Sequence, residues 1–207
     1  SMKVLLINGS PHEKGCTYTA LSLIAGELNA SGIETEILNV GGQPVGGCIG
    51  CGGCRSGNGC VFGGVVNEAI EKAKTADAFV FGTPVHYASA SGNMTSFMDR
   101  LAYAGGKYLA YKPAAICASA RRAGTTTTLD QLVKYPEFFH MPLVSGSYWP
   151  MVHGSKPEQV LEDEEGCAVM RELGRNMAWL LKCIELGKAN GITHPENPRR
   201  PMTNFIR

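Results

Sequence analysis

The chain has 207 residues, of which 44% are hydrophobic and 18% charged, and its formal net charge is +1. This length and composition suit one domain over residues 1–207 with one sizeable core. Nearly balanced charge, without a basic run or stripe, argues against nucleic acid as the main partner. No apolar stretch approaches the length of a membrane span, so we expect a cytoplasmic protein.

The first predicted strand covers residues 3–8, an unbroken apolar run that indicates burial on both faces. The turn after it carries small residues and hydroxyls, and a helix opens near Ala20. Backbone N–H groups of such a turn, with the positive end of the helix dipole, form a phosphate site. The alternative is an ordinary strand-to-helix connection in which Thr17 or Thr19 caps the helix.

Two common phosphate-binding loops do not match this turn. Nucleotide hydrolases need Gly-Lys-Ser/Thr, and this chain has Gly15–Cys16–Thr17 instead. Dinucleotide folds need Gly-x-Gly-x-x-Gly, which is also missing. What remains is a hydroxyl-lined loop for one terminal phosphate, as flavin mononucleotide (FMN) carries.

Residues 33–40 alternate between apolar and polar side chains, which predicts a strand at the edge of the sheet. The pattern then stops. From residue 41 to 64, eleven of twenty-four residues are glycine and four are cysteine. A loop of this length inside a domain is usually functional or disordered. We call residues 41–64 the cysteine loop.

The four cysteines of this loop have the spacing C-x2-C-x2-C-x5-C, formed by Cys48, Cys51, Cys54 and Cys60. Thiolates at this spacing, with glycine between them, resemble the ligands of ferredoxin clusters, although no proline follows the last cysteine. Zinc ribbons place their cysteine pairs further apart, so zinc is the weaker metal candidate. Free thiols and a redox disulfide are the alternatives to a metal centre.

The rest of the chain alternates between helices and strands. Further strands are expected at residues 78–82, 113–118 and 142–147, and helices at residues 65–73, 94–102, 125–136 and 163–189. The tail from residue 191 has three prolines and should be extended. This alternation predicts an α/β fold: a flavodoxin-like three-layer sandwich whose five-stranded parallel sheet has the order 2-1-3-4-5, with helices on both faces.

In such a fold the ligand lies at the carboxyl ends of the strands, near the first and third strands. Three loops meet there: residues 9–19, 83–91 and 119–125. All three carry the glycine and polar residues that a ligand site needs. We call them the three convergent loops.

Motifs in these loops resemble a known family. Asn8–His12 with Gly15–Thr17, then Thr83–Tyr87, then Ser119–Thr125 resemble the NADPH-dependent FMN reductase branch of the flavodoxin-like superfamily, close to the iron–sulfur flavoproteins. The resemblance covers nearly the whole chain and implies FMN as the cofactor. The cofactor-binding residues that it implies are Ser10, His12, Cys16, Thr17, Tyr18, Thr19, Pro84, Val85, His86, Tyr87, Ser119, Arg121, Arg122 and Gly124.

Within that set, the family places the phosphate on the first loop and the isoalloxazine ring against the other two. This chain departs from the family at Cys16, where many relatives have asparagine. Arg121, Arg122 and His86 are interpreted as site residues, because they cluster where the fold predicts a site.

The resemblance implies an oxidoreductase that takes hydride from NADPH or NADH and passes electrons to a quinone, a free flavin or another small acceptor. No side chain is nominated as catalytic, because the cofactor carries the chemistry. The alternative is an iron–sulfur flavoprotein, an electron carrier that docks on protein partners. Its [4Fe–4S] cluster would be held by Cys48, Cys51, Cys54 and Cys60. A homodimer or homotetramer is also implied, with Tyr148, Trp149 and Met151 as the expected contact.

Overall fold

The structure is a computed structural model that describes residues 1–204. Its strands are β1 (Lys3–Asn8), β2 (Glu34–Asn39), β3 (Ala78–His86), β4 (Ser89–Ala90), β5 (Ala114–Ala120) and β6 (Met151–His153). Its α-helices are α1 (Cys16–Ala30), α2 (Val65–Thr75), α3 (Gly92–Gly105), α4 (Thr125–Phe138), α5 (Pro157–Glu162) and α6 (Glu164–Ala189). Two short 3-10 turns are η1 (Gly53–Ser56) and η2 (Gly106–Tyr108).

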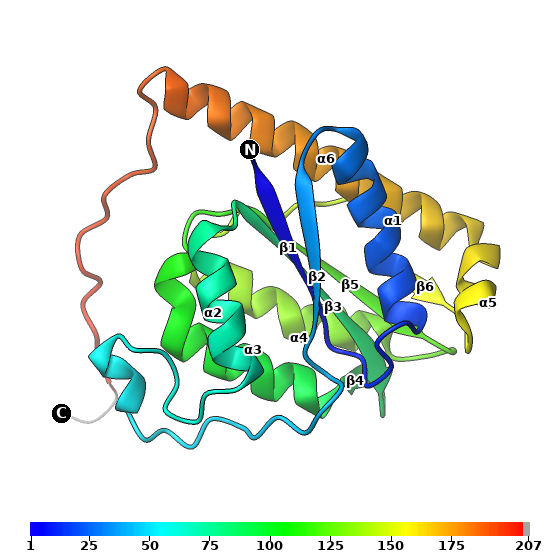
Figure 1. The fold of residues 1–207 in the computed structure, drawn as a ribbon, viewed down its shortest axis with the longest axis horizontal. Coiled ribbons are helices and arrows are strands. Elements are labelled where there is room, and N and C mark those ends of the chain that lie inside the picture. Colours follow the sequence, from blue (N-terminus) through cyan, green and yellow to red (C-terminus); the bar gives the residue numbers. More distant parts are fainter. Residues whose placement is uncertain (205–207) are drawn as a thin grey trace.

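The strands form a sheet between two layers of helices (Figure 1). Five strands run parallel in the order β2-β1-β3-β5-β6, and β4 pairs antiparallel with the end of β3. Without the hairpin strand β4, this is the predicted order 2-1-3-4-5. The flavodoxin-like fold expected from the sequence is therefore confirmed.

Each face of the sheet has its own core. Leu6 of β1 packs with α1 and α6 on one face, whereas Leu5 and Ile7 pack with α2, α3 and α4 on the other. This division follows from the period of a strand, in which successive side chains point to opposite faces. Burial on both faces explains why β1 is an unbroken apolar run.

The fifth strand lies later in the chain than expected. In the segment predicted as a strand, residues 142–147, only Leu143 forms a bridge, to Ala114, and the strand beside β5 is β6. Helix α6 explains the difference, because Asn176 Nδ2 donates to the Ser145 carbonyl at 2.7 Å and Glu172 Oε2 accepts from the Ser147 amide at 2.8 Å. These bonds satisfy backbone groups that a longer strand would pair with β5.

The helix ends differ slightly from the expected ones. Helix α4 continues two residues past Pro136, to Phe138, although we expected it to stop by the proline. Asp163 caps α6 by accepting a hydrogen bond from the Gly166 amide at 3.0 Å, close to the predicted start. Helix α5 was not expected.

The cysteine loop follows β2 and contains η1 but no strand or α-helix. Figure 1 shows it at the lower left of the view, beside α2 and α3. Residues 192–204 follow α6 without helix or strand, as expected for the tail. Among the described residues, no helix combines the length and the apolar character that a membrane crossing requires.

Close packing of α1 against α6 gives a stability prediction. A Cβ at Gly174 of α6 would lie 2.6 Å from the Ile24 carbonyl oxygen, whereas a Cβ at the exposed Gly26 of α1 would meet nothing within 4 Å. Gly174→Ala and Gly26→Ala gain the same helix propensity, about 1 kcal/mol. The difference between them therefore isolates the clash, which we expect to lower the free energy of unfolding by about 1–3 kcal/mol in urea titrations. Equal stability of the two variants would contradict this packing.

Candidate functional site

The turn between β1 and α1 is fixed by side-chain hydrogen bonds. Asn8 Oδ1 accepts from the Ser10 amide at 3.1 Å, and its Nδ2 donates to the Glu13 carbonyl at 3.1 Å. Ser10 Oγ accepts from the His12 amide, and Asn39 Nδ2 donates to the Ser10 carbonyl at 2.9 Å. The turn is therefore preorganised within the protein.

Helix α1 begins without a side-chain cap. Its N-cap residue is Gly15, and neither threonine takes the capping role: Thr19 donates to the Gly15 carbonyl at 3.1 Å, and Thr17 pairs with Ser119. The capping alternative considered from the sequence is wrong. The N–H groups of the first turn have no side-chain acceptor in the described chain, so they are available to an anion.

The structure brings the three convergent loops together. The hydroxyls of Thr17 and Ser119 lie 2.7 Å apart and are buried, which joins α1 to the end of β5. Ser91 Oγ donates to the Gly9 carbonyl at 3.0 Å, and the Ser91 amide donates to Thr83 Oγ1 at 3.2 Å. These three bonds tie the carboxyl ends of β1, β3 and β5 into one unit.

The turn between β3 and β4 projects two unusual residues. Tyr87 and Ala88 have φ values of 48° and 61°, in the left-handed region that costs non-glycine residues energy. Tyr87 is also fully exposed, and its neighbour His86 is exposed. Gly124 packs so closely that a Cβ there would overlap Ala88 Cα. An aromatic side chain held open on a strained turn is available for contact with a ligand.

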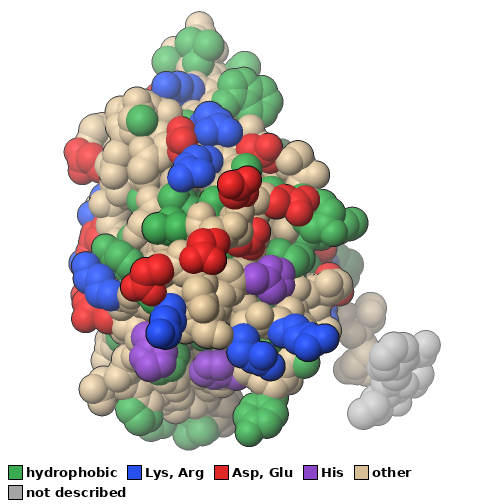
Figure 2. Space-filling model, turned by 90° about the vertical axis from the view of Figure 1, so that its right-hand side faces the viewer, with side chains coloured by type: hydrophobic (Ala, Val, Ile, Leu, Met, Phe, Trp, Pro, Cys, Tyr) green, Lys and Arg blue, Asp and Glu red, His purple; other side chains and the backbone are tan. Residues whose placement is uncertain are grey.

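The same edge carries positive charge. Arg121 and Arg122 are exposed and take part in no ion pair within residues 1–204, and His12 is exposed in the first loop. In Figure 1 the carboxyl ends of the parallel strands point toward the lower end of the molecule. Figure 2 shows one side of the molecule, with basic and histidine side chains near that lower end. Acidic side chains lie above them. Such an arrangement attracts an anionic ligand.

Two cavities differ in their relation to this edge. One, of about 700 Å³, lies between α4 and residues 143–150, with Tyr148 and Trp149 in its wall. The other, of about 460 Å³, lies between α1 and β2 and is lined in part by Glu13, Lys14 and Tyr18 of the first loop. We place the candidate site on the three convergent loops, because their polar groups meet at the carboxyl ends of the strands.

The cysteine loop has the donor atoms for a metal centre. All four thiols are free; Cys48 and Cys51 are exposed, and Cys54 and Cys60 are half-buried. The Gly50 amide donates to Cys48 Sγ at 3.5 Å, and glycines with positive φ separate the cysteines. This donor set fits a thiolate-bound cluster. The thiols have not gathered around one point, since no three metal-binding side chains among residues 1–204 form a group that could hold an ion.

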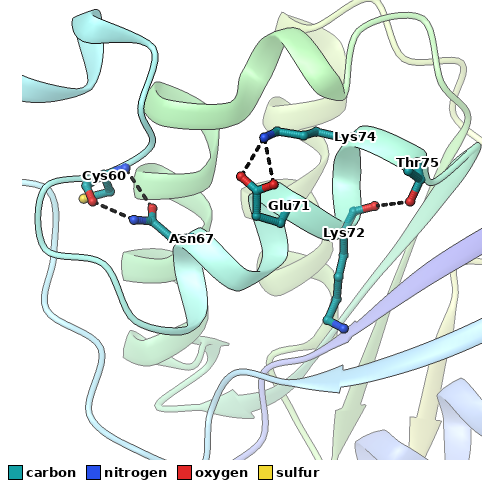
Figure 3. Close-up of polar contacts among 6 residues, drawn as sticks. All are labelled: Cys60, Asn67, Glu71, Lys72, Lys74 and Thr75. Atoms are coloured by element: carbon teal, nitrogen blue, oxygen red, sulfur yellow. Dashed lines mark hydrogen bonds and ion pairs between the residues drawn. The ribbon is translucent and has the colours of Figure 1, made fainter.

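Cys60 is held from two helices. Asn67 of α2 accepts from the Cys60 amide at 2.8 Å and donates to its carbonyl at 2.9 Å (Figure 3). Arg100 of α3 donates through Nε to Cys60 Sγ at 3.4 Å. Burial alone would raise the pKa of the Cys60 thiol, but hydrogen bonds from the Phe62 and Gly63 backbone and from Arg100 outweigh it and lower the pKa. A lowered pKa favours the thiolate, which is the form that binds metal.

Comparison with known proteins places these features in a family. The family described as NADPH-dependent FMN reductase matches residues 2–156 of the chain. The chain belongs to the NADPH-dependent FMN reductase family. The resemblance seen in its motifs is thus confirmed, and the family and the fold support FMN as the cofactor.

Relatives within reach of sequence comparison are named iron–sulfur flavoproteins. One, from Methanocaldococcus jannaschii, is 30% identical over 193 residues, which cover 89% of this chain and 100% of the relative. Another, from Archaeoglobus fulgidus, is 30% identical over 196 residues, covering 91% and 96% of the two chains.

Solved structures share the fold of this FMN reductase family member. RosB, solved with a bound riboflavin-5'-phosphate derivative, has a TM-score of 0.69 at 14% identity, covering 100% of this chain and 96% of its own. The apo form of an NADH:FMN oxidoreductase has a TM-score of 0.61 at 19% identity, covering 88% and 90%.

Cysteine labelling tests the environment of the thiols. Burial raises the pKa of the Cys117 thiol to about 12, whereas Cys48 and Cys51 are exposed. In metal-free, reduced protein at pH 8, we expect iodoacetamide to label Cys117 on the order of a hundredfold more slowly than Cys48 and Cys51. Peptide mass spectrometry measures the rates, and urea should remove the difference. Fast labelling of Cys117 in the folded protein would contradict its position in the core.

Proposed function

We propose that this protein is an FMN-dependent oxidoreductase whose cofactor binds on the three convergent loops. The observation that carries this proposal is the uncapped start of α1, locked to the end of β5 by the bond between Thr17 and Ser119. A phosphate at this point would accept hydrogen bonds from the free N–H groups of the first helical turn. The family match supports FMN as the molecule that brings the phosphate.

The residues of the first loop would bind the phosphate. We assign this role to Ser10, Thr17, Tyr18 and Thr19, with His12 and Cys16 beside them. His12 lies open at the surface. The hydroxyls of Ser10 and Thr17 already stabilise the loop, so their first contribution is to hold the N–H groups in place.

The other two loops would hold the ring. Pro84, Val85 and His86 end β3, and Tyr87 lies in the strained turn that follows, where its exposed ring can cover a flat ligand. On the other side, Ser119 and Gly124 bracket Arg121 and Arg122, whose positive charge favours the negatively charged form of a reduced flavin. Bound FMN supplies hydride acceptance and electron transfer. The protein supplies position, charge and partial exclusion of water.

Electrons would come from NADH or NADPH and leave to a quinone, a free flavin or another small acceptor. The family name supports a nicotinamide donor. A second candidate is an iron–sulfur flavoprotein that exchanges single electrons with protein partners. It is favoured by the names of the relatives and by the four cysteines of the cysteine loop. These would hold a [4Fe–4S] cluster: Cys48, Cys51, Cys54 and Cys60. A cytoplasmic location and a homodimer or homotetramer belong to the same proposal.

A glycine variant tests the FMN site. Gly124 has a φ of 98° and touches Ala88, whereas Gly32 has a φ of 79° with nothing near its missing Cβ. Gly124→Ala and Gly32→Ala should each lose about 1–2 kcal/mol of stability from backbone strain. Only Gly124→Ala pushes two of the convergent loops apart, so only it should weaken FMN binding, about tenfold or more in calorimetry. Equal FMN affinity in both variants would contradict the assigned ring site.

An anaerobic preparation separates the two candidates. We expect yellow protein with one FMN per chain that NADPH bleaches within seconds if the nicotinamide oxidoreductase is correct. Flavin that only a reduced protein donor bleaches, together with about four irons and four sulfides per chain, supports the iron–sulfur flavoprotein. A colourless protein that takes up no FMN in calorimetry would contradict both.

A further inference from the structure

We propose that Arg100 is a positioning residue for the cysteine loop: it closes the base of the loop and supplies the positive charge beside its sulfur ligands. This inference rests on the part of the proposed function that assigns a cluster to Cys48, Cys51, Cys54 and Cys60. It concerns a residue on α3, outside both the cysteine motif and the three convergent loops.

The burial of Arg100 is the first observation. Only 7% of the residue is exposed, on a helix face that otherwise packs Met94, Phe97 and Leu101 into the core. Its guanidinium forms no ion pair with a carboxylate anywhere in residues 1–204. A buried charge without a charged partner is costly. The position therefore calls for negative charge that carboxylates do not provide.

The contacts of Arg100 show where that negative charge lies. Nη1 donates to the Gly46 carbonyl at 3.1 Å, Nη2 to the Gly63 carbonyl at 3.0 Å, and Nε to Cys60 Sγ at 3.4 Å. The only atom among these three that can carry a full negative charge is the sulfur. Arg100 thus has its charge facing a thiolate ligand.

The two carbonyls lie on opposite sides of the cysteine motif. Gly46 precedes Cys48 and Gly63 follows Cys60, so one side chain joins the two ends of the segment that contains all four cysteines. Two turns earlier on α3, Asn93 accepts from the Val45 amide and donates to carbonyls at the start of the loop. Residues seven apart lie on one face of a helix, so α3 presents a single polar edge to the loop.

The chemistry of the contacts requires arginine. Three acceptors in different directions are reached by three nitrogens of one planar guanidinium. Lysine has one nitrogen, whose donors cannot span both carbonyls and the sulfur. Lysine would keep the charge and lose the connection between the two ends of the loop.

The expected consequence concerns electron affinity. Hydrogen bonds to ligand sulfurs and the local net charge set the reduction potential of an iron–sulfur centre. A guanidinium keeps its proton in proteins, so it is a constant positive charge when one electron enters and no bond breaks. Arg100 should therefore make reduction of the centre more favourable.

The test uses the full chain, reconstituted anaerobically with FMN, iron and sulfide. Arg100→Gln removes both the charge and the planar guanidinium, whereas Arg100→Lys keeps the charge alone. Asn67→Ala removes only the contacts to the Cys60 backbone (Figure 3). Reductive titrations followed by electron paramagnetic resonance give the potential. The rate of iron loss to a chelator measures how firmly the loop holds, and FMN content reports an intact fold.

Arg100→Gln should shift the one-electron equilibrium about tenfold toward the oxidised centre, which equals 59 mV. Arg100→Lys should recover most of that shift while losing iron at least about tenfold faster than the wild type. Asn67→Ala should lose iron faster without the shift in potential, because it changes no charge.

Two results would overturn the role of Arg100. One is an Arg100→Gln protein with wild-type potential; if that variant fails to fold, wild-type iron retention in Arg100→Lys serves instead. A wild-type protein that takes up FMN but no iron or sulfide overturns the cluster and Arg100 together, while the FMN site stands.

Discussion

The bond between the buried hydroxyls of Thr17 and Ser119 is the contact on which the candidate site depends. It joins the first turn of α1 to the carboxyl end of β5, and the two residues are 102 positions apart in the sequence. Thr17 lies inside α1, whose N-cap is Gly15, so its hydroxyl does not cap the helix, and the amide donors of the helix start stay available. One hydroxyl pair thus aligns two loops beside the electropositive end of a helix.

Helix α3 connects this site with the cysteine loop. Ser91, its N-cap, accepts from Met94 and donates to Gly9, which holds the first loop. Arg100, nine positions later, holds the cysteine loop. At 1.5 Å per residue, these positions are separated by about 14 Å along the helix axis. A helix with an apolar face in the core keeps such a separation constant, so α3 fixes the cysteine loop relative to the three convergent loops.

Sequence patterns predicted the parts of this protein that depend on short-range regularity. The apolar runs of β1 and β3 and the spacing of Met94, Phe97 and Leu101 led to the correct sheet order and helix layers. The convergence of the three loops also followed from the parallel sheet, since its carboxyl ends meet at one edge.

The errors concern contacts between distant parts of the chain. A threonine in the first turn is typical of a cap, and nothing local indicates that Thr17 pairs with Ser119 instead. Residues 142–147 are apolar enough for a strand, but Glu172 and Asn176 of α6 hold their backbone away from the sheet. Arg100 went unnoticed because it lies beside apolar residues on α3; the one available signal was its seven-residue spacing from Asn93, which has meaning only once the loop is seen to pack there.

The buried guanidinium also bears on the chemistry of the cysteine loop. A disulfide is neutral, and so are protonated thiols. Either form would leave the positive charge of Arg100, of which only 7% is exposed, without a negatively charged partner. Thiolates bound to a metal centre keep their negative charge at the sulfur, which satisfies the guanidinium where it already donates, at Cys60 Sγ. A free Cys60 thiolate would also satisfy the guanidinium, and the lowered pKa of this thiol favours that form, so the surrounding protein charge favours a thiolate at Cys60, free or metal-bound, over a disulfide or a protonated thiol.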